Sequence, residues 1–429
     1  MVIPVIKNTY VVLGYGRSGR ESEKHLLAQG YDVIVCDDAQ QKTLDINWTE
    51  ITAVVQSPGI SPSHPLSLVA KTAGVSICTD LDLLQKRSPM AKYIGITGTN
   101  GKSTTTALIG HILKQAGLKV EVGGNIGVPA LSLKNLDENG WYVLELSSYQ
   151  LELSNDLNLD IAVWVNISPD HLDRHGTIEN YVNAKKRIFN HAKWVCIAVD
   201  DGHSKKVSAE LTIPHKTVAS EFKNYPADIW IDAVGMLHNE GALFNCNELE
   251  TLKGAHNWQN VALAFAATNH VLNSPQEIWE HIQTFPGLAH RQQLVTKIGT
   301  IEFINDSKAT NADACEKALK TYMGQNIFWI LGGVAKTDGI DLLKPYFPYI
   351  KKAYLIGEAQ DRFANTLKDT VVFEKCPSLD VAVSKARVDA MVEEDAVVLL
   401  SPACASFDQF RDYEHRGEEF IQIVRKISL

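Results

Sequence analysis

The chain lacks the features that mark membrane, secreted and zinc-binding proteins. No apolar run reaches the ~18 residues that a membrane-spanning helix needs, and the first residues form no signal-peptide pattern. The seven cysteines are scattered, with no C-x-x-C pair and no zinc-like spacing to histidine. We therefore expect a cytoplasmic protein, kept in a reducing compartment, that has no membrane partner.

The chain also lacks the excess of basic residues that nucleic-acid-binding proteins carry. Its formal net charge is -9 and its pI is about 5.9, so we expect no nucleic acid as partner. There is no internal repeat and no low-complexity tract. A hydrophobic content of 45% is typical of a globular enzyme, and 429 residues are too many for one ordinary core. Two or three domains are expected.

Residues 97–104 are the most informative stretch, with the glycine-rich sequence T-G-T-N-G-K-S-T. An apolar run with strand character precedes them and a run with helical periodicity follows. Glycines let backbone N–H groups face an anion at a helix N-terminus. Lys102 can neutralise phosphate charge, and Ser103 or Thr104 can offer a hydroxyl to Mg²⁺. The stretch predicts a site for ATP or GTP, since the flanking patterns disfavour an ordinary strand-to-helix turn.

The first segment, residues 1–89, is predicted to be a Rossmann-like domain. The sequence G-Y-G-R-S-G at residues 14–19 follows a strand-like run and precedes a helical pattern, and a second strand ends at Asp37. A third strand leads into Ser57-Pro58-Gly59 at the same predicted sheet edge. Such a turn suits NAD or another diphosphate, such as a UDP-sugar, and the pattern alone leaves both open.

The other two segments also predict α/β domains, so the expected fold is three α/β domains: N-terminal Rossmann-like, central P-loop-type ATPase sheet, and C-terminal Rossmann-like. The central domain is predicted over residues 90–287 and the C-terminal domain over residues 288–429. Strands alternate with helical patterns in both, as in parallel sheets. The expected strands are residues 141–146, 161–167, 194–198, 301–305, 327–331, 353–356 and 396–400.

Several polar residues follow predicted strands of the central domain. Glu145 ends an apolar strand, so it should reach the sheet edge of the phosphate loop and face Ser103 as an Mg²⁺ ligand. A capping or salt-bridged glutamate is the alternative. Asp170, His171 and Asp173 lie on the loop after the next strand. A histidine in such a loop is more often structural than a ligand, but the predicted proximity to Glu145 favours a ligand.

Further polar patterns of the sequence are less specific. Residues 181–187 look like a solvated basic helix face, and the turn at Asn125 can be a plain turn or a phosphate or sugar contact. Asn257 and Asn260 lie at the expected start of an alanine-rich helix. They can simply mark that helix start, or their paired amides can bind a purine or ribose. Arg291 opens the third segment and is expected to reach a triphosphate as a bidentate cation.

These motifs resemble the Mur ligase family. The phosphate loop has the short form that Mur ligases and folylpolyglutamate synthetases use. Residues 305–311, N-D-S-K-A-T-N, and residues 399–410, L-L-S-P-A-C-A-S-F-D-Q-F, resemble the family members that add D-glutamate. The resemblance covers essentially the whole chain. It implies an ADP-forming ligase that joins D-glutamate to UDP-N-acetylmuramoyl-L-alanine through an acyl phosphate, in peptidoglycan precursor synthesis. By analogy, a monomer is expected.

The resemblance also implies three sets of binding residues. The set for ATP comprises Thr99, Asn100, Gly101, Lys102, Ser103, Thr104, Thr105, Asn257, Asn260, Arg291 and Asp306. The set for the UDP-sugar, in place of NAD, comprises Arg17, Ser18, Asp37, Gly59, Asn125 and His171. The set for D-glutamate comprises Thr310, Lys336, Ser406, Phe407 and Tyr413.

The metal site that the resemblance implies holds two Mg²⁺ ions. Its members are Ser103, Glu145, His171 and Lys185, and Lys185 would be carbamylated, which turns a cation into a carboxylate. Buried lysines with a depressed pKa are the ones that react with CO₂. The catalytic set is then Lys102, Glu145, His171, Lys185 and Arg291.

Other functions stay open at this point. Within the superfamily, the chain can be another Mur-type ligase or a folylpolyglutamate synthetase, although folate enzymes lack the N-terminal segment seen here. From other classes, an NAD-linked oxidoreductase, a nucleotide-dependent regulator and a non-catalytic binding protein remain.

Overall fold

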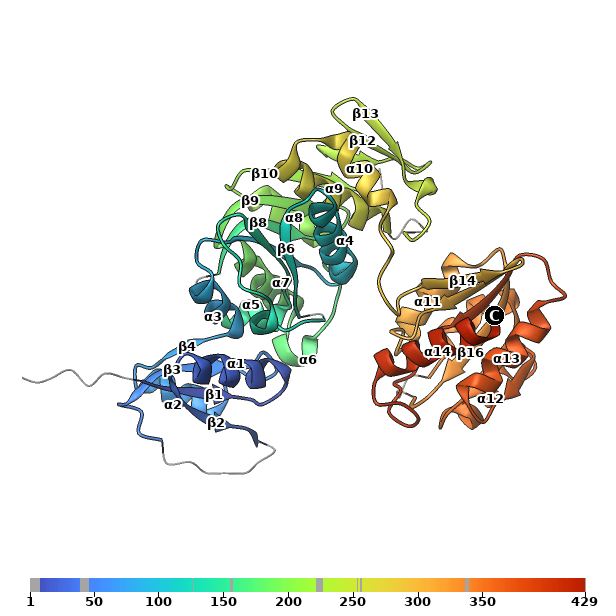
Figure 1. Cartoon of the computed structure of the whole chain (residues 1–429), viewed down its shortest axis with the longest axis horizontal. Coiled ribbons are helices and arrows are strands. Elements are labelled where there is room, and N and C mark those ends of the chain that lie inside the picture. Colours follow the sequence, from blue (N-terminus) through green and yellow to red (C-terminus); the bar gives the residue numbers. More distant parts are fainter. Residues whose placement is uncertain are drawn as a thin grey trace, which may run out of the picture. The chain divides into compact units, whose positions relative to one another are not determined.

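The computed structural model describes residues 8–38, 46–125, 127–154, 157–220, 227–252, 254, 257–335 and 339–428. These residues form three β-sheets with flanking helices (Figure 1). The chain divides into two compact units. Unit 1 comprises residues 1–250 and 254–285, and unit 2 comprises residues 251–253 and 286–429.

Unit 1 begins with a parallel four-stranded sheet of order β2-β1-β3-β4. Its strands are β1 (Thr9–Leu13), β2 (Asp32–Cys36), β3 (Ile51–Gln56) and β4 (Ser76–Cys78). Its helices are α1 (Arg17–Ala28), α2 (Pro65–Thr72) and α3 (Asp80–Arg87). A Cβ on Gly19 would lie 2.0 Å from the Gly14 carbonyl oxygen, so glycine is what lets α1 approach β1 closely.

The second sheet of unit 1 has nine strands in the order β13-β12-β11-β10-β9-β8-β5-β7-β6. The strands are β5 (Lys92–Thr97), β6 (Lys119–Gly124), β7 (Gly140–Glu145), β8 (Asn158–Trp164), β9 (His191–Ala198), β10 (His215–Ala219), β11 (Ile229–Ile231), β12 (Met236–Asn239) and β13 (Ala242–Asn245). The helices are α4 (Lys102–Gln115), α5 (Ser148–Leu153), α6 (Leu172–His175), α7 (Ile178–Lys186), α8 (Gly202–Glu210), α9 (Trp258–Leu272) and α10 (Pro275–Gln283), with 3₁₀ turns η2 (Ala130–Ser132), η3 (Arg187–Phe189) and η4 (Cys246–Glu248). Strand β12 runs antiparallel to both of its neighbours, β11 and the edge strand β13, and the other described pairs of this sheet are parallel.

Unit 2 contains a six-stranded sheet of order β14-β15-β19-β16-β17-β18. The strands are β14 (Gln293–Ile298), β15 (Ile301–Asn305), β16 (Asn326–Gly332), β17 (Ile350–Ile356), β18 (Phe373–Lys375) and β19 (Ala396–Leu400). The helices are α11 (Ala312–Thr321), α12 (Gln360–Leu367), α13 (Leu379–Ala390) and α14 (Tyr413–Ser428), with the 3₁₀ segment η6 (Asp341–Tyr349). All pairs are parallel except β14 with β15, which a short hairpin joins.

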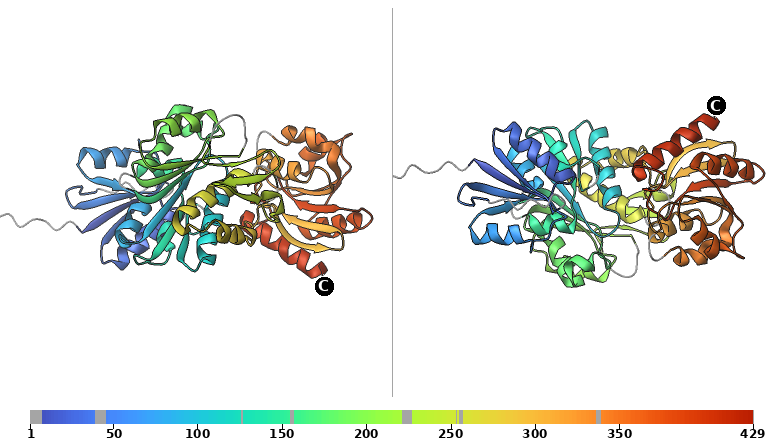
Figure 2. Two further views of the ribbon diagram at one scale, coloured as in Figure 1. Left: turned by 90° about the horizontal axis from the view of Figure 1, so that it is seen from above. Right: turned by 90° about the horizontal axis from the view of Figure 1, so that it is seen from below.

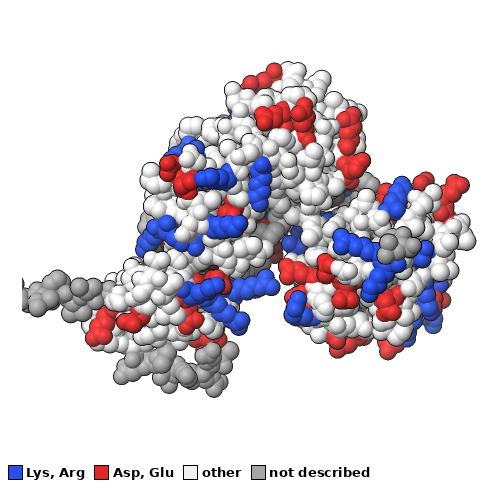
Figure 3. Space-filling model, in the orientation of Figure 1, with Lys and Arg blue, Asp and Glu red and all other residues white. Residues whose placement is uncertain are grey.

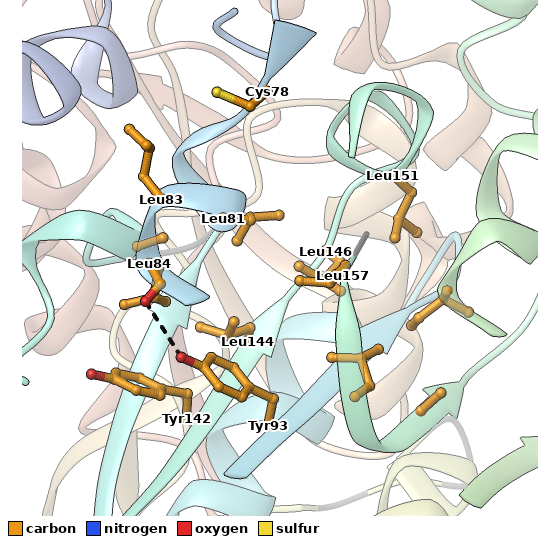
Figure 4. Packing of buried hydrophobic residues seen from close by; sticks show 14 of the residues in the cluster. Cys78, Leu81, Leu83, Leu84, Tyr93, Tyr142, Leu144, Leu146, Leu151 and Leu157 are labelled. Carbon is orange, nitrogen blue, oxygen red and sulfur yellow. Dashed lines mark hydrogen bonds between the residues drawn. The ribbon is translucent and has the colours of Figure 1, made fainter. Parts of the chain in front are cut away.

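One hydrophobic cluster runs through both sheets of unit 1. It includes Tyr10 of β1 and Val55 of β3 as well as Tyr93 of β5 and Leu144 of β7. Helix α3 supplies Leu81, Leu83 and Leu84 to it, close to the stacked rings of Tyr93 and Tyr142 (Figure 4). This shared core accounts for the two sheets forming one compact unit.

In unit 2 the parallel strands are buried on both faces. One cluster packs α11, α12 and η6 against one face of the sheet, and another packs α13 and α14 against the other. Figure 2 shows helices on both sides of this sheet. The apolar runs of β16 and β19, which show no alternation, are typical of strands covered on both faces.

The predicted strands are all present. The expected strands 301–305 and 396–400 match β15 and β19 residue for residue, and the others differ by a few residues at their ends. The antiparallel edges β12–β13 and β14 were not predicted. The three sheets fall within the three predicted segments, whose boundaries stay predictions.

The cysteine side chains lie in the interior of the protein. All seven cysteines are buried as free thiols.

Figure 3 shows Lys and Arg side chains interspersed with Asp and Glu over the face in view. Among the described helices, none is both long and apolar enough to cross a membrane.

The close approach of α1 to β1 can be tested with a pair of glycine variants. Gly19→Ala should destabilise the β1–α1 region by about 2 kcal/mol, because the added Cβ overlaps the Gly14 carbonyl. Gly16→Ala is the matched control: a Cβ there meets nothing within 4 Å, so the cost should stay below about 1 kcal/mol. Hydrogen exchange of the β1 and α1 amides measures both. Equal exchange in the two variants would contradict the packing argument.

Candidate active site

Strand order brings three loops of unit 1 together. Strand β5 lies between β7 and β8, and all three run parallel. Their carboxyl ends therefore open at one edge, where ligands bind in open α/β sheets. The loop after β5 carries residues 98–101, β7 ends at Glu145, and the loop after β8 carries Asn166 and His171.

The phosphate loop has the backbone that its glycines predict. Gly98 and Gly101 have φ angles of 152° and 83°, and Gly101 is the N-cap of α4. A Cβ on Gly101 would lie 2.1 Å from Asn260 Oδ1, so α9 packs directly on this turn. Thr105 Oγ1 donates to the same Asn260 oxygen at 3.2 Å, and Asn260 Nδ2 donates to Asn257 Oδ1 at 3.2 Å. The predicted phosphate and nucleoside residues of unit 1 therefore lie together.

The Lys102 amine points back into its own loop. Its Nζ donates to the carbonyl oxygens of Thr99 at 2.8 Å and of Gly98 at 3.0 Å. Backbone carbonyls satisfy its donors in this state, and phosphate oxygens are the charged acceptors that would compete for them.

Lys185, on α7, is buried against the same loop. Only 1% of its surface is exposed, and its Nζ donates to the Gly98 carbonyl oxygen at 2.8 Å. The Tyr181 ring lies beneath the amine, 4.7 Å from ring centre to Nζ. Burial, and next the nearby Lys102 charge, lower the pKa of Lys185 well below its usual value. The sequence pattern alone suggested a solvated basic face, and for Lys185 that interpretation is wrong.

Glu145 is buried at the end of β7 and receives two side-chain hydrogen bonds. Ser103 Oγ donates to one carboxylate oxygen at 2.8 Å, and Asn125 Nδ2 donates to the other at 2.9 Å. The alternative of a salt-bridged glutamate does not hold, because within the part of the chain that the structure describes its hydrogen-bond partners are neutral and it forms no ion pair. The predicted proximity of Ser103 and Glu145 is confirmed by this contact.

The oxygen atoms of Glu145 and Ser103 can supply part of the coordination shell of a Mg²⁺ ion. A carboxylate and a hydroxyl in contact are hard oxygen ligands of the kind Mg²⁺ prefers, with water and phosphate completing its shell. The described residues contain no group of three or more His, Cys, Asp or Glu side chains that could hold a metal by themselves. The site therefore suits a cation that arrives with a phosphate ligand.

His171 belongs to an aromatic cluster beside this edge. Its backbone is left-handed at φ 52°, and its Nδ1 lies 3.1 Å from the Tyr149 hydroxyl. Tyr181 joins the cluster and its hydroxyl lies 3.1 Å from Thr99 Oγ1. The buried His175 bonds Ser148 Oγ at 3.0 Å. Hydrogen bonds and ring contacts thus connect the His171 loop to the phosphate loop.

Two amides that the sequence analysis did not select hold the phosphate loop in place. Asn166 Oδ1 accepts from the Asn100 N–H at 2.9 Å, and its amide nitrogen donates to Gln259 Oε1 at 2.7 Å. Gln259 in turn donates to Asp200. A polar residue two positions after the end of β8 was the available signal, at a place where ligand contacts are expected.

The N-terminal sheet of unit 1 presents a second group of predicted residues. Asp37 accepts from the Tyr15 N–H at 2.6 Å, within the G-x-G turn. Ser18 hydrogen-bonds the buried carboxyl of Asp80, whose pKa burial raises to about 6. Arg17 is exposed at the start of α1, and Gly59 lies on the loop after β3. These positions share the carboxyl edge of the sheet.

Arg174 ties this second group to the His171 loop. Its guanidinium donates to Glu152 at 3.1 Å and to the Ile60 carbonyl oxygen at 3.1 Å, and it lies over the Tyr149 ring. Ile60 follows Gly59, so one side chain connects the loop after β3 to the loop after β8.

Unit 2 holds the remaining predicted nucleotide residues. Asp306 is fully buried and accepts from the Gln292 N–H at 3.1 Å and from Ser401 Oγ at 2.8 Å. Burial raises its pKa to about 7. Arg291 adjoins Gln292 in sequence, so the chain brings Arg291 and Asp306 to one edge of this sheet.

The predicted D-glutamate residues of unit 2 follow β15 and β19. Ser406 is buried, Phe407 is exposed, and Thr310 and Tyr413 are half-buried. Lys336 lies outside the described residues. Sequence reasoning missed Arg416, whose guanidinium is fully buried below these loops. No sequence signal marked it, because an arginine on an amphipathic helix normally faces water.

The sequence matches two domains of the Mur ligases, one after the other along the chain. Residues 96–268 match the Mur ligase middle domain, and residues 290–404 match the Mur ligase glutamate ligase domain. Among solved structures, a UDP-N-acetylmuramate-alanine ligase from Thermotoga maritima has a TM-score of 0.62 at 15% identity, covering 98% of this chain and 99% of that one. That likeness shows the fold.

Curated relatives are similar over nearly their whole length. A UDP-N-acetylmuramoylalanine--D-glutamate ligase from Phenylobacterium zucineum is 42% identical, with 98% of this chain and 96% of that protein covered. One of the same description from Paramagnetospirillum magneticum is 41% identical, with 99% and 98% covered. The phosphate loop, the Ser103–Glu145 contact and the buried Lys185 lie inside the matched middle domain, and this chain belongs to the Mur ligase family.

Proposed function

We propose that this chain is the Mur ligase that joins D-glutamate to UDP-N-acetylmuramoyl-L-alanine at the expense of ATP. The observation that carries the proposal is the edge of unit 1 where Lys102, Ser103, Glu145 and the buried Lys185 meet around one phosphate loop. Near-complete similarity to relatives named for this reaction supports the choice of substrates.

Lys102 and the phosphate-loop amides would bind the triphosphate of ATP, and Asn257 and Asn260 the nucleoside end. Ser103 and Glu145 would hold Mg²⁺, which neutralises charge on the phosphoryl group that is transferred. The N-terminal edge, with Asp37 and the loop at Gly59, would bind the uridine diphosphate, so NAD has no role.

The reaction has two chemical steps. An oxygen of the L-alanine carboxylate bonds to the γ-phosphorus of ATP. At the same time the bond between the γ-phosphorus and the oxygen that links it to the β-phosphorus breaks, which gives an acyl phosphate and ADP. The D-glutamate amine then attacks the acyl carbon, and phosphate leaves from the tetrahedral intermediate. Lys102 stabilises the charge of the first step. The amine must lose a proton, and His171 is the side chain we propose as its acceptor.

Lys185 would act as a carbamate. Its lowered pKa favours the free amine, which is the form that attacks CO₂. The nitrogen of the neutral amine bonds to the carbon of CO₂ and one proton is released, which leaves a carboxylate in place of the amine. With Glu145 this provides a second anionic ligand for magnesium, which the amine itself cannot be.

Substrate choice is tested by phosphate release from Mg-ATP with UDP-N-acetylmuramoyl-L-alanine and a panel of amino acids. We expect release with D-glutamate and at most a few per cent of that rate with L-glutamate, its matched enantiomer. Release with a different amino acid would keep the ligase but contradict the proposed acceptor. Absence of release with all of them would contradict the ligase proposal itself.

The role of Lys185 is tested by replacing it and its neighbour. Lys185→Ala should lower turnover by roughly a hundredfold or more, since the proposed second anionic ligand of magnesium is lost. Bicarbonate or a short-chain acid should restore part of the rate by filling the gap. Lys186→Ala is the control, because Lys186 bonds Glu210 on the surface and should be dispensable. Full activity of Lys185→Ala would refute the carbamate.

A further inference from the structure

Arg416, on α14 of unit 2, is a fully buried cation that bonds backbone loops. Its Nε donates to Ser307 Oγ at 3.0 Å, and one terminal nitrogen donates to the carbonyl oxygens of Ser307 at 2.9 Å and Cys404 at 3.1 Å. The other terminal nitrogen donates to the Gly332 carbonyl oxygen at 3.4 Å. Ser307, Gly332 and Cys404 follow or end β15, β16 and β19, which are neighbours in the sheet.

No carboxylate neutralises this guanidinium at contact distance. Among the ion pairs of the described residues, Arg416 has none, and its acceptors are three carbonyls and a hydroxyl. Asp306 and Asp408 act on it only at longer range, and burial lowers its pKa to about 10, so it stays charged at neutral pH. A buried charge without a counter-ion is costly, and an anion placed nearby would recover part of that cost.

The loops that Arg416 bonds are the ones that carry the proposed amino-acid pocket. Thr310 lies three residues after Ser307, and Ser406 lies two residues after Cys404. Tyr413 lies one helical turn before Arg416, and its carbonyl oxygen accepts from Ser307 Oγ at 2.8 Å. Each described residue of the proposed pocket is therefore close in sequence, or hydrogen-bonded, to a group that Arg416 holds.

The geometry points to Arg416 as the positioning residue of the amino-acid pocket. We propose that its forked guanidinium group fixes three loops relative to one another. Its charge, which no carboxylate contacts among the described residues, would favour an amino acid with an anionic side chain. The inference rests on the proposed function, because it concerns how the D-glutamate site of that reaction is built.

Steady-state kinetics of the full-length enzyme with Mg²⁺ test this inference. Arg416→Lys keeps the charge and loses the fork, so the KM for D-glutamate should rise roughly tenfold. Arg416→Met loses both, and the KM for D-glutamate should rise roughly a hundredfold, while the KM for UDP-N-acetylmuramoyl-L-alanine should change by less than about twofold in each variant. The Lys variant is the conservative change that keeps the test informative if the Met variant does not fold.

Phe420→Leu provides the matched control for stability. Phe420 is fully buried on the same helix and contacts the core instead of the loops. It should lower the melting temperature and leave the KM for D-glutamate unchanged. An unchanged KM for D-glutamate in Arg416→Lys and in folded Arg416→Met, or an equal rise in the KM for UDP-N-acetylmuramoyl-L-alanine, would overturn the inference. A wild-type enzyme that does not use D-glutamate would instead overturn the proposed function.

Discussion

The carbonyl oxygen of Gly98 is the point on which the site of unit 1 depends. It accepts from Lys185 Nζ at 2.8 Å and from Lys102 Nζ at 3.0 Å, so two amines that normally carry charge share one acceptor. Repulsion between them and the burial of Lys185 favour the neutral amine at that position. Gly98 can present its carbonyl to both because its φ of 152° and its lack of a Cβ let the loop pass close to Val165 and Asn166.

A similar arrangement recurs in unit 2 around Arg416. In unit 1 the Lys185 amine on α7 donates to the Gly98 carbonyl after β5, and in unit 2 the Arg416 cation on α14 donates to carbonyls on the loops after β15 and β19. Parallel strands leave such carbonyls together at one edge, and a cation there can fix several loops at once while remaining available to an anionic ligand. The same edge thus supplies both rigidity and charge.

Local patterns made the framework predictable from the sequence. The glycines and Lys102 of the phosphate loop, the strand end at Glu145, and the apolar runs of β15 and β19 each follow from short-range rules. The burial of Lys185 and Arg416 does not, since both lie on helices whose polar residues look solvated. Acceptors that hold them lie far away in sequence: Gly98 is 87 residues from Lys185, and Ser307 is 109 residues from Arg416. The contact of Asn260 with Gly101 is also long-range, and only the fold reveals it.

The most direct test of the account is the chemical state of Lys185 in the wild-type enzyme. Carbon-13 NMR after equilibration with ¹³C-bicarbonate should show a carbamate signal that persists in Lys186→Ala and is absent from Lys185→Ala. An active wild-type enzyme without that signal would contradict the claim that the buried amine beside Gly98 captures CO₂.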